Sequence, residues 1–310
     1  MDSKTSEIDE AGGAHGDGPS GSPPDATSAA TVPAGDGAAL EAVAGLVGAF
    51  MTKRRSDPVA PVVDERELAA RLSEFDFDAP RPLDVAAADL LDVLGRFAVR
   101  SDHPAYFGLF NPPALATGIA GDLVAAAVNP QLAVWSHAPA AVEIERRLIS
   151  FFGSLVWPDA DVAGTFTSGG SEANATVLLA ALGRRCPAWA EHGLAACDRR
   201  PAIFTSAEAH LAWIKIARMS GLGSRAVVLV PTADGLSMSA SDLAAAIEAR
   251  PDLDPVLMVG TAGTTAHGAI DDLRGVADVA KAHDSHFHVD AAWAGGGLPH
   301  EPLRPLFHGI

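Results

Sequence analysis

The stretch HFHVDAAWAGG, residues 286–296, ends a short apolar pattern on a carboxylate and continues directly into small residues and glycines. Phe287 and Val289 supply the apolar positions of a short strand, and Asp290 stands at the carboxyl end. Ligands of open α/β sheets bind outside the carboxyl ends of the strands. In a sheet of this kind, Asp290 is therefore a candidate ligand-binding residue.

Outward from this stretch, short apolar runs alternate with helical patterns through the second half of the chain. Helices are expected at residues 116–128 and 138–156 and after the glycine pair at 169–170. Continuous apolar strands separated by helices are typical of a mostly parallel sheet covered by helices. The predicted fold class is α/β, with strands at Gly164–Thr167, Ala202–Thr205, Ala226–Val230, Val256–Gly260 and His286–Asp290.

Three segments differ in composition. Residues 1–38 hold almost no large apolar side chains and cannot bury enough surface to offset their ordering entropy, so we predict a disordered acidic tail. Apolar residues then recur at helical spacing around 40–50 and 90–97. We predict a helical N-terminal arm over residues 39–115 and a site-bearing domain over residues 116–310.

Charge and composition exclude several classes of partner. The chain has 22 Lys and Arg against 39 Asp and Glu, a formal net charge of -17, which argues against nucleic acid. No apolar run approaches the roughly 20 residues of a membrane span, and the acidic N-terminus does not resemble a signal peptide. Cys186 and Cys197 are too few for a disulfide framework, so we expect a cytoplasmic protein.

The motif TSGGSEAN, residues 167–174, follows a predicted strand and opens an apolar helix. The N–H groups at a helix start favour an anion, and Gly169 and Gly170 would let it approach closely while Ser171 adds a hydroxyl. A phosphate site is one interpretation. The other is an ordinary helix start with Ser168 or Ser171 as its cap.

Two further motifs follow predicted strands. TSAEAH, residues 205–210, places His210 at a helix start, where it could stack on a planar ligand, carry a proton or simply be solvated. GTAGTT, residues 260–265, places the hydroxyls of Thr264 and Thr265 at the same edge of the sheet, or forms an ordinary loop.

Asp290 at a strand end can pair with a cationic ring nitrogen and keep that nitrogen protonated. Strand alternation also puts His286 and His288 on the same face as Asp290, so a metal site is an alternative. No further ligand constellation accompanies them, and we expect no metal.

Taken together and in this order, TSGGSEAN, TSAEAH, GTAGTT and HVDAAWAGG resemble the group II pyridoxal-phosphate-dependent amino acid decarboxylases. The resemblance covers about two thirds of the chain, from HPAYFGLFNP through WSHAPAAVEIERRL to the end. It implies the type I aminotransferase-like fold, pyridoxal 5'-phosphate as the cofactor, an L-amino acid as the small-molecule substrate and a homodimer. The implied reaction releases carbon dioxide and leaves the amine.

The resemblance also implies roles for individual residues. Gly169, Gly170 and Ser171 would hold the phosphate, and His210 would stack on the pyridine ring. Asp290 would pair with the pyridinium nitrogen, so His210 and Asp290 are the expected catalytic residues. The remaining expected contacts are Thr265 and Ala292 to the cofactor and Tyr106, Phe107, Leu109 and Phe110 to the substrate.

The lysine that forms the Schiff base in this family follows the Asp motif in an Asp/Asn-x-His-Lys context. No such motif occurs before Ile310, and neither Lys215 nor Lys281 has that context. We therefore expect an incomplete large domain, the N-terminal part of a longer enzyme, with severely impaired or absent turnover in the chain alone.

Two alternatives stay open. One is another enzyme of the same fold, such as an aminotransferase, a sulfur-removing lyase or a carbon–carbon lyase. The other is a non-catalytic protein that binds the cofactor weakly or dimerises with a full-length relative. The sequence does not identify the amino acid substrate.

Overall fold

The computed structural model describes residues 34–53, 56–108, 111–232 and 235–310. The chain divides into two compact units, Met1–Leu115 and Ala116–Ile310. Residues 1–33 of the predicted tail lie outside the described residues. Residues 34–38, which we assigned to that tail, instead begin a helix, because Ala38 and Ala39 are strong helix formers ahead of the first large apolar side chain.

The first unit contains the helices α1 (Ala34–Thr52), α2 (Glu65–Leu72) and α3 (Leu83–Phe97). Asp64 caps α2 by accepting a hydrogen bond from the backbone N–H of Arg66 at 2.8 Å. Helices α1 and α3 pack closely enough that a Cβ on Gly95 would lie 3.3 Å from the ring of Phe50. The helical patterns around residues 40–50 and 90–97 thus form helices as predicted.

The second unit carries a parallel four-stranded sheet in the order β2-β1-β3-β4. Its strands are β1 (Arg200–Ser206), β2 (Val227–Val230), β3 (Leu253–Thr261) and β4 (His286–Asp290). Its α-helices are α4 (Ala116–Val128), α5 (Pro139–Val156), α6 (Gly170–Arg185), α7 (Trp189–His192), α8 (Ala212–Met219), α9 (Ala240–Glu248) and α10 (Leu273–Ala282). The predicted α/β class with a parallel sheet is confirmed.

The predicted strand at Gly164–Thr167 is wrong, because this segment has no regular secondary structure and pairs with no strand among the described residues. A strand exists only as a member of a hydrogen-bonded ladder. Here the backbone N–H of Phe166 is bonded to the carboxylate of Glu145 on α5 at 3.3 Å, and the Phe166 side chain is 54% exposed.

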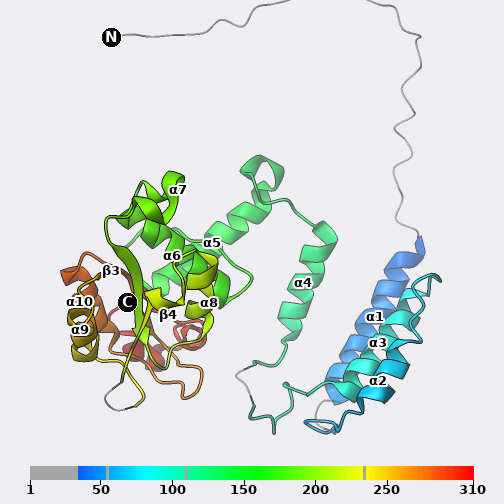
Figure 1. Ribbon diagram of the computed structural model, residues 1–310. Helices are drawn as coiled ribbons and strands as arrows, with labels where there is room; N and C mark the ends of the chain where they lie inside the picture. The colour runs from blue at the N-terminus through cyan, green and yellow to red at the C-terminus, as the bar shows by residue number, and fades with distance from the viewer. Residues whose placement is uncertain (1–33, 54–55, 109–110, 233–234) are drawn as a thin grey trace, which may run out of the picture. The chain divides into compact units, whose positions relative to one another are not determined.

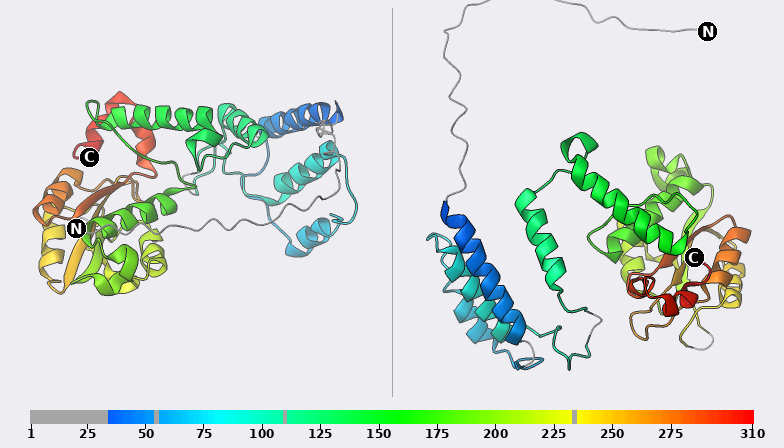
Figure 2. Two further views of the ribbon diagram at one scale, coloured as in Figure 1. Left: turned by 90° about the horizontal axis from the view of Figure 1, so that it is seen from above. Right: turned by 180° about the vertical axis from the view of Figure 1, so that it is seen from behind.

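Helices cover both faces of the sheet. In Figure 1, α9 and α10 lie on one side of β3 and β4, and α6 and α8 lie on the other; Figure 2 shows this unit from two further directions. The side chains of β1 alternate between the two layers, since Ile203 packs with Leu178 and Trp213 while Phe204 packs with Leu243. Both faces of β1 and β3 are therefore apolar, as their sequences indicate.

Candidate functional site

The order of the strands defines an edge where ligands bind in sheets of this kind. Strand β2 lies on one side of β1, and β3 and β4 follow on the other, so the direction of winding reverses between β1 and β3. The crevice outside the carboxyl ends at such a reversal is the usual ligand site. Thr261 at the end of β3 is paired in register with Asp290 at the end of β4, which places Asp290 at this edge.

The Asp290 carboxylate is buried and held in place by two donors. Its Oδ2 accepts a hydrogen bond from Nδ2 of Asn174 on α6 at 2.8 Å, and its Oδ1 accepts one from the backbone N–H of Ala292 at 3.2 Å. Asp290 and Asn174 are 8% and 4% exposed. A carboxylate has about four acceptor positions, so two donors leave room for a further cationic donor.

The other end of the Asn174 amide contacts His288. Nε2 of His288 lies 2.9 Å from Oδ1 of Asn174, and because an amide oxygen only accepts, this nitrogen carries the proton. Burial lowers the pKa of His288 to about 4, although the nearby Asp290 acts in the opposite direction. His288 is neutral at physiological pH, and its ring lies edge to face with Trp213 at 5.8 Å between centroids.

The glycine motif lies at the same edge, at the start of α6. A Cβ on Gly170 would lie 3.0 Å from Cβ of Ala292, whereas one on Gly169 would meet nothing within 4 Å. The proposed serine cap is wrong, because Gly169 occupies the N-cap position without a side-chain cap. Ser168 instead donates from its hydroxyl and its backbone N–H to Glu172, which lowers the pKa of that carboxyl.

The motifs after β1 and β3 also meet at this edge. Nδ1 of His267 lies 3.6 Å from the carboxylate of Glu208, which joins the two loops. His210 is exposed, and its Nδ1 accepts the backbone N–H of Ala212 at 3.1 Å, at the start of α8. Thr265 lies in an exposed turn of the same loop as His267.

The loop after β3 also packs against the segment after β4. Gly263 adopts φ +97, and a Cβ there would lie 2.5 Å from the Trp293 ring, so both backbone conformation and space require glycine. The side chain of Thr264 is buried and accepts the backbone N–H of Ala269 at 3.1 Å. Thr264 therefore stabilises the loop, in agreement with the interpretation of GTAGTT as an ordinary loop.

The expected substrate residues belong to the first unit. Tyr106 is half-buried, and its ring lies against Gly108, while Phe107 is 92% exposed. Leu109 and Phe110 lie outside the described residues. The role of this segment in a substrate pocket stays a prediction.

Two site residues were missed by the sequence analysis. Asn174 recurs with Leu178, Ala181 and Leu182 on the buried face of α6, so a polar residue within an apolar stripe was the available signal. Asp271 is buried and accepts the backbone N–H groups of Thr261 and Met238, both at 2.7 Å. Asp271 anchors the end of β3. The one signal for it in the sequence was its position after the loop that contains Gly263 and Gly268.

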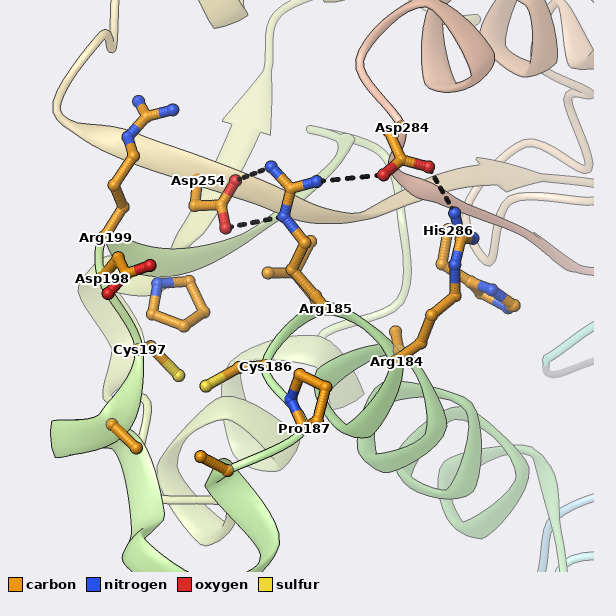
Figure 3. Close-up of a pocket in the computed structure, with 15 residues that line it drawn as sticks. Arg184, Arg185, Cys186, Pro187, Cys197, Asp198, Arg199, Asp254, Asp284 and His286 are labelled. Atoms are coloured by element: carbon orange, nitrogen blue, oxygen red, sulfur yellow. Dashed lines mark hydrogen bonds and ion pairs between the residues drawn. The ribbon is translucent and has the colours of Figure 1, made fainter.

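A different cavity of about 430 Å³ lies at the opposite, amino-terminal edge of the sheet (Figure 3). There Arg185 makes a two-pronged ion pair with Asp254, at 2.7 and 2.9 Å, and also contacts Asp284. The side chains of Cys186 and Cys197 point toward each other, and burial raises the pKa of Cys197 to about 12. Arg184 and Arg185 are paired with Asp254 and Asp284, so these ion pairs tie the end of α6 to β3 and to the segment before β4.

Within the described ranges, no group of three His, Cys, Asp or Glu side chains is arranged to hold a metal ion. Two of the three residues considered as metal ligands, His288 and Asp290, both form hydrogen bonds with Asn174. Among the helices that the structure describes, none combines the length and apolar character needed to cross a membrane.

Comparison with known proteins agrees with this arrangement. The family described as "Pyridoxal-dependent decarboxylase conserved domain" matches residues 70–310, which include all four motifs. The acidic amino acid decarboxylase GADL1 of Mus musculus is 33% identical over 217 residues. That alignment covers 69% of this chain and 39% of the relative, so the chain matches well under half of the relative's length.

Solved structures show the same fold. The crystal structure of mouse CSAD in apo form is similar with a TM-score of 0.81 and 29% identity, over 89% of this chain and 59% of that chain. The crystal structure of Oryza sativa TDC with PLP and tryptamine is similar with a TM-score of 0.80 and 25% identity, over 90% and 59%. The predicted type I aminotransferase-like fold is confirmed. The chain belongs to the pyridoxal-dependent decarboxylase family, whose cofactor is pyridoxal phosphate.

Proposed function

We propose that this chain forms the cofactor-binding part of an enzyme that converts an L-amino acid to the amine and carbon dioxide. The observation that carries the proposal is the buried Asp290 carboxylate at the carboxyl end of β4, held by Asn174 beside the junction of Gly170 and Ala292. Family membership supports the reaction class, and the amino acid side chain that the enzyme accepts is left open.

The residues at this edge fit pyridoxal phosphate. Asp290 offers a buried carboxylate with acceptor positions left for a pyridinium N–H. The N–H groups of Gly170 and Ser171 precede the first hydrogen bonds of α6, which Glu172 and Ala173 donate to Gly169, and a Cβ on Gly169 would meet nothing within 4 Å, as a phosphate requires. A Cβ on Gly170 would lie 3.0 Å from Cβ of Ala292, so the absence of a side chain at Gly170 lets the first turn of α6 pack closely against the segment after Asp290.

Each residue then has a proposed task. When bound, the cofactor supplies a pyridinium ring that accepts the electron pair left on the substrate when the bond to the carboxylate breaks. Asp290 holds the proton on the ring nitrogen, because a carboxylate stabilises a cation that it contacts. Gly169, Gly170 and Ser171 bind the phosphate, and His210 stacks on the ring. A proton replaces the departing carbon dioxide on the α-carbon, which leaves the amine.

A titration with pyridoxal phosphate, followed by tryptophan fluorescence and visible absorption, tests this function. We expect Asp290→Asn to weaken binding by about 10- to 100-fold, because a charge-assisted hydrogen bond is lost. Asp284→Asn is the matched control, since Asp284 is exposed at the other edge of the sheet. Equal affinity in the wild type and Asp290→Asn would contradict the assignment of the site.

We further propose that the 310-residue chain alone has no appreciable turnover. Lys281 stands in the last turn of α10, which leads into the amino end of β4, opposite Asp290. Lys215, on α8, lines a groove of about 420 Å³ beside Ser168 and Ser171. Neither lysine follows the Asp motif in the family context, so the covalent exchange that uses this lysine is not available.

Borohydride reduction of the chain loaded with pyridoxal phosphate, followed by mass mapping, tests this second proposal. We expect no stoichiometric adduct on any one lysine. A full adduct on Lys215 or Lys281, or robust release of carbon dioxide from an amino acid, would show that the site is complete.

The expected assembly and location are also proposals. A homodimer is supported by family membership, and the apolar side chains exposed along α5 offer surface for it. A cytoplasmic location is supported by the two free cysteines.

A further inference from the structure

The polar chain behind Asp290 consists of three side chains from two elements. Asn174 on α6 donates to Asp290 on β4, and Nε2 of His288, two residues earlier on β4, lies 2.9 Å from the oxygen of the same amide. Both interactions are at least partly buried, in an otherwise apolar layer that contains Leu178 and Trp213.

The amide of Asn174 has one orientation that satisfies both neighbours. Turned around, its oxygen would face the Asp290 carboxylate, and two acceptors would lie against each other without a proton. In the observed orientation, N–H donates to the carboxylate and the oxygen accepts from His288. The Asp290 carboxylate thereby selects the orientation of the amide, and His288, with its proton on Nε2, adds a second hydrogen bond that holds Asn174 in that same orientation.

We propose that Asn174 is a positioning residue for the cofactor: Asn174 holds the Asp290 carboxylate in place, and the hydrogen bond from His288 restrains the Asn174 amide in the orientation that donates to Asp290. The inference rests on the proposed function, because the positioned group acts only on a bound ring. Among the described residues, the other donor to Asp290 is the backbone N–H of Ala292, at the longer distance of 3.2 Å. Without Asn174, the carboxylate keeps only that weaker restraint.

Pyridoxine 5'-phosphate labelled with ¹⁵N in the ring is a suitable probe, because it has the ring and phosphate but no aldehyde to react with surface lysines. Calorimetry gives its affinity for the full chain. The ¹⁵N chemical shift gives the fraction of ring nitrogen protonated, at a pH where the free probe is unprotonated. This second readout separates positioning from a general effect on stability.

We expect the wild-type chain to protonate the bound ring and Asp290→Asn to abolish that protonation. Asn174→Leu, similar in size, should weaken binding about 10-fold and shift the ring nitrogen toward the unprotonated value. Thr176→Val is the matched control, because it removes a polar atom from the exposed side of α6, where the Thr176 hydroxyl donates to the backbone oxygen of Glu172.

His288 provides an independent arm if Asn174→Leu does not fold. His288→Gln retains an N–H donor and should protonate the ring nearly as the wild type does, whereas His288→Leu removes the donor and should reduce protonation. The two variants differ in the donor and are otherwise of similar size.

The outcomes separate the two proposals. A wild-type chain that does not bind the probe overturns the proposed function and this inference with it. Loss of binding in Asp290→Asn, with wild-type ring protonation in Asn174→Leu and His288→Leu, overturns this inference alone. Increased protonation in Asn174→Leu also overturns it, because Asn174 would then moderate the basicity of Asp290 rather than place it.

Discussion

His288 shows at the scale of a single residue how burial sets a charge state. Its Nε2 contacts Asn174 and its ring packs edge to face with Trp213, and desolvation disfavours the imidazolium form more strongly than Asp290 favours it. The neutral ring is therefore the form compatible with the fold, with its one proton directed at Asn174.

This charge state predicts a loss of stability in mild acid. The unfolded chain protonates this histidine near its ordinary pKa of 6.5, while the folded chain does so only near about 4. As the pH drops from 6.5 to about 4, the unfolded chain binds a proton at His288 before the folded chain does. The contribution of His288 to the free energy of unfolding therefore falls over this pH range, by roughly 3 kcal/mol in total.

Urea unfolding at several pH values, for the wild type and His288→Gln, measures this contribution. Glutamine does not titrate, so the advantage of the wild type over His288→Gln should shrink between neutral pH and about pH 4. A stability difference between the two proteins that is constant with pH would contradict a lowered pKa.

Helix α6 is the element that connects the site to the core. Its first turn carries the glycine motif, its second carries Asn174, and Leu178 and Leu182 bury the following turns against β1 and β3. Its end is tied to β3 by the ion pair of Arg185 with Asp254, which raises the pKa of the arginine. Packing of this helix therefore sets where its first turn, the proposed phosphate-binding turn, lies.

Two adjacent leucines of α6 give a matched test of this packing. Leu178 is fully buried and Leu179 is 45% exposed. Leu178→Ala should lower the free energy of unfolding by about 2–5 kcal/mol, because it leaves a cavity in the core, while Leu179→Ala should change it by about 0.5 kcal/mol or less. Similar losses in both variants, measured by denaturant unfolding, would show that α6 does not pack as described.

At the scale of the whole molecule, large apolar side chains remain exposed on α5. Ile144, Leu148 and Phe151 recur at helical spacing and are 63%, 42% and 53% exposed. A contiguous apolar stripe of this kind marks an association surface more often than a free one. It is the physical basis, beside family membership, for expecting a homodimer.

Sedimentation of charged variants of α5 tests the association. Phe151→Asp places a charge in the stripe and should shift the chain toward the monomer, with at least a 10-fold rise in the dimer dissociation constant, or about 1.4 kcal/mol. Ser150→Asp introduces the same charge one position away, outside the stripe, and should have a smaller effect. A wild-type chain that is monomeric at all concentrations would refute the expected dimer.

The sequence by itself determined the fold class, four of the five expected strands and the family, because apolar periodicity and strand-end motifs are local properties. It also located the edge where Asp290, Gly170 and Ala292 lie together. It overpredicted the strand at 164–167, since strand formation depends on a partner far away in the chain.

Only the tertiary structure decided which side chains hold Asp290 in place and which charge state they have. Asn174 and Asp290 are 116 residues apart in sequence, and their contact depends on how α6 packs on β4. The neutral state of His288 likewise follows from burial among side chains of other elements. Short sequence motifs indicate which residues belong to the candidate site. The orientation and charge of their side chains depend on packing between residues that are far apart in the sequence.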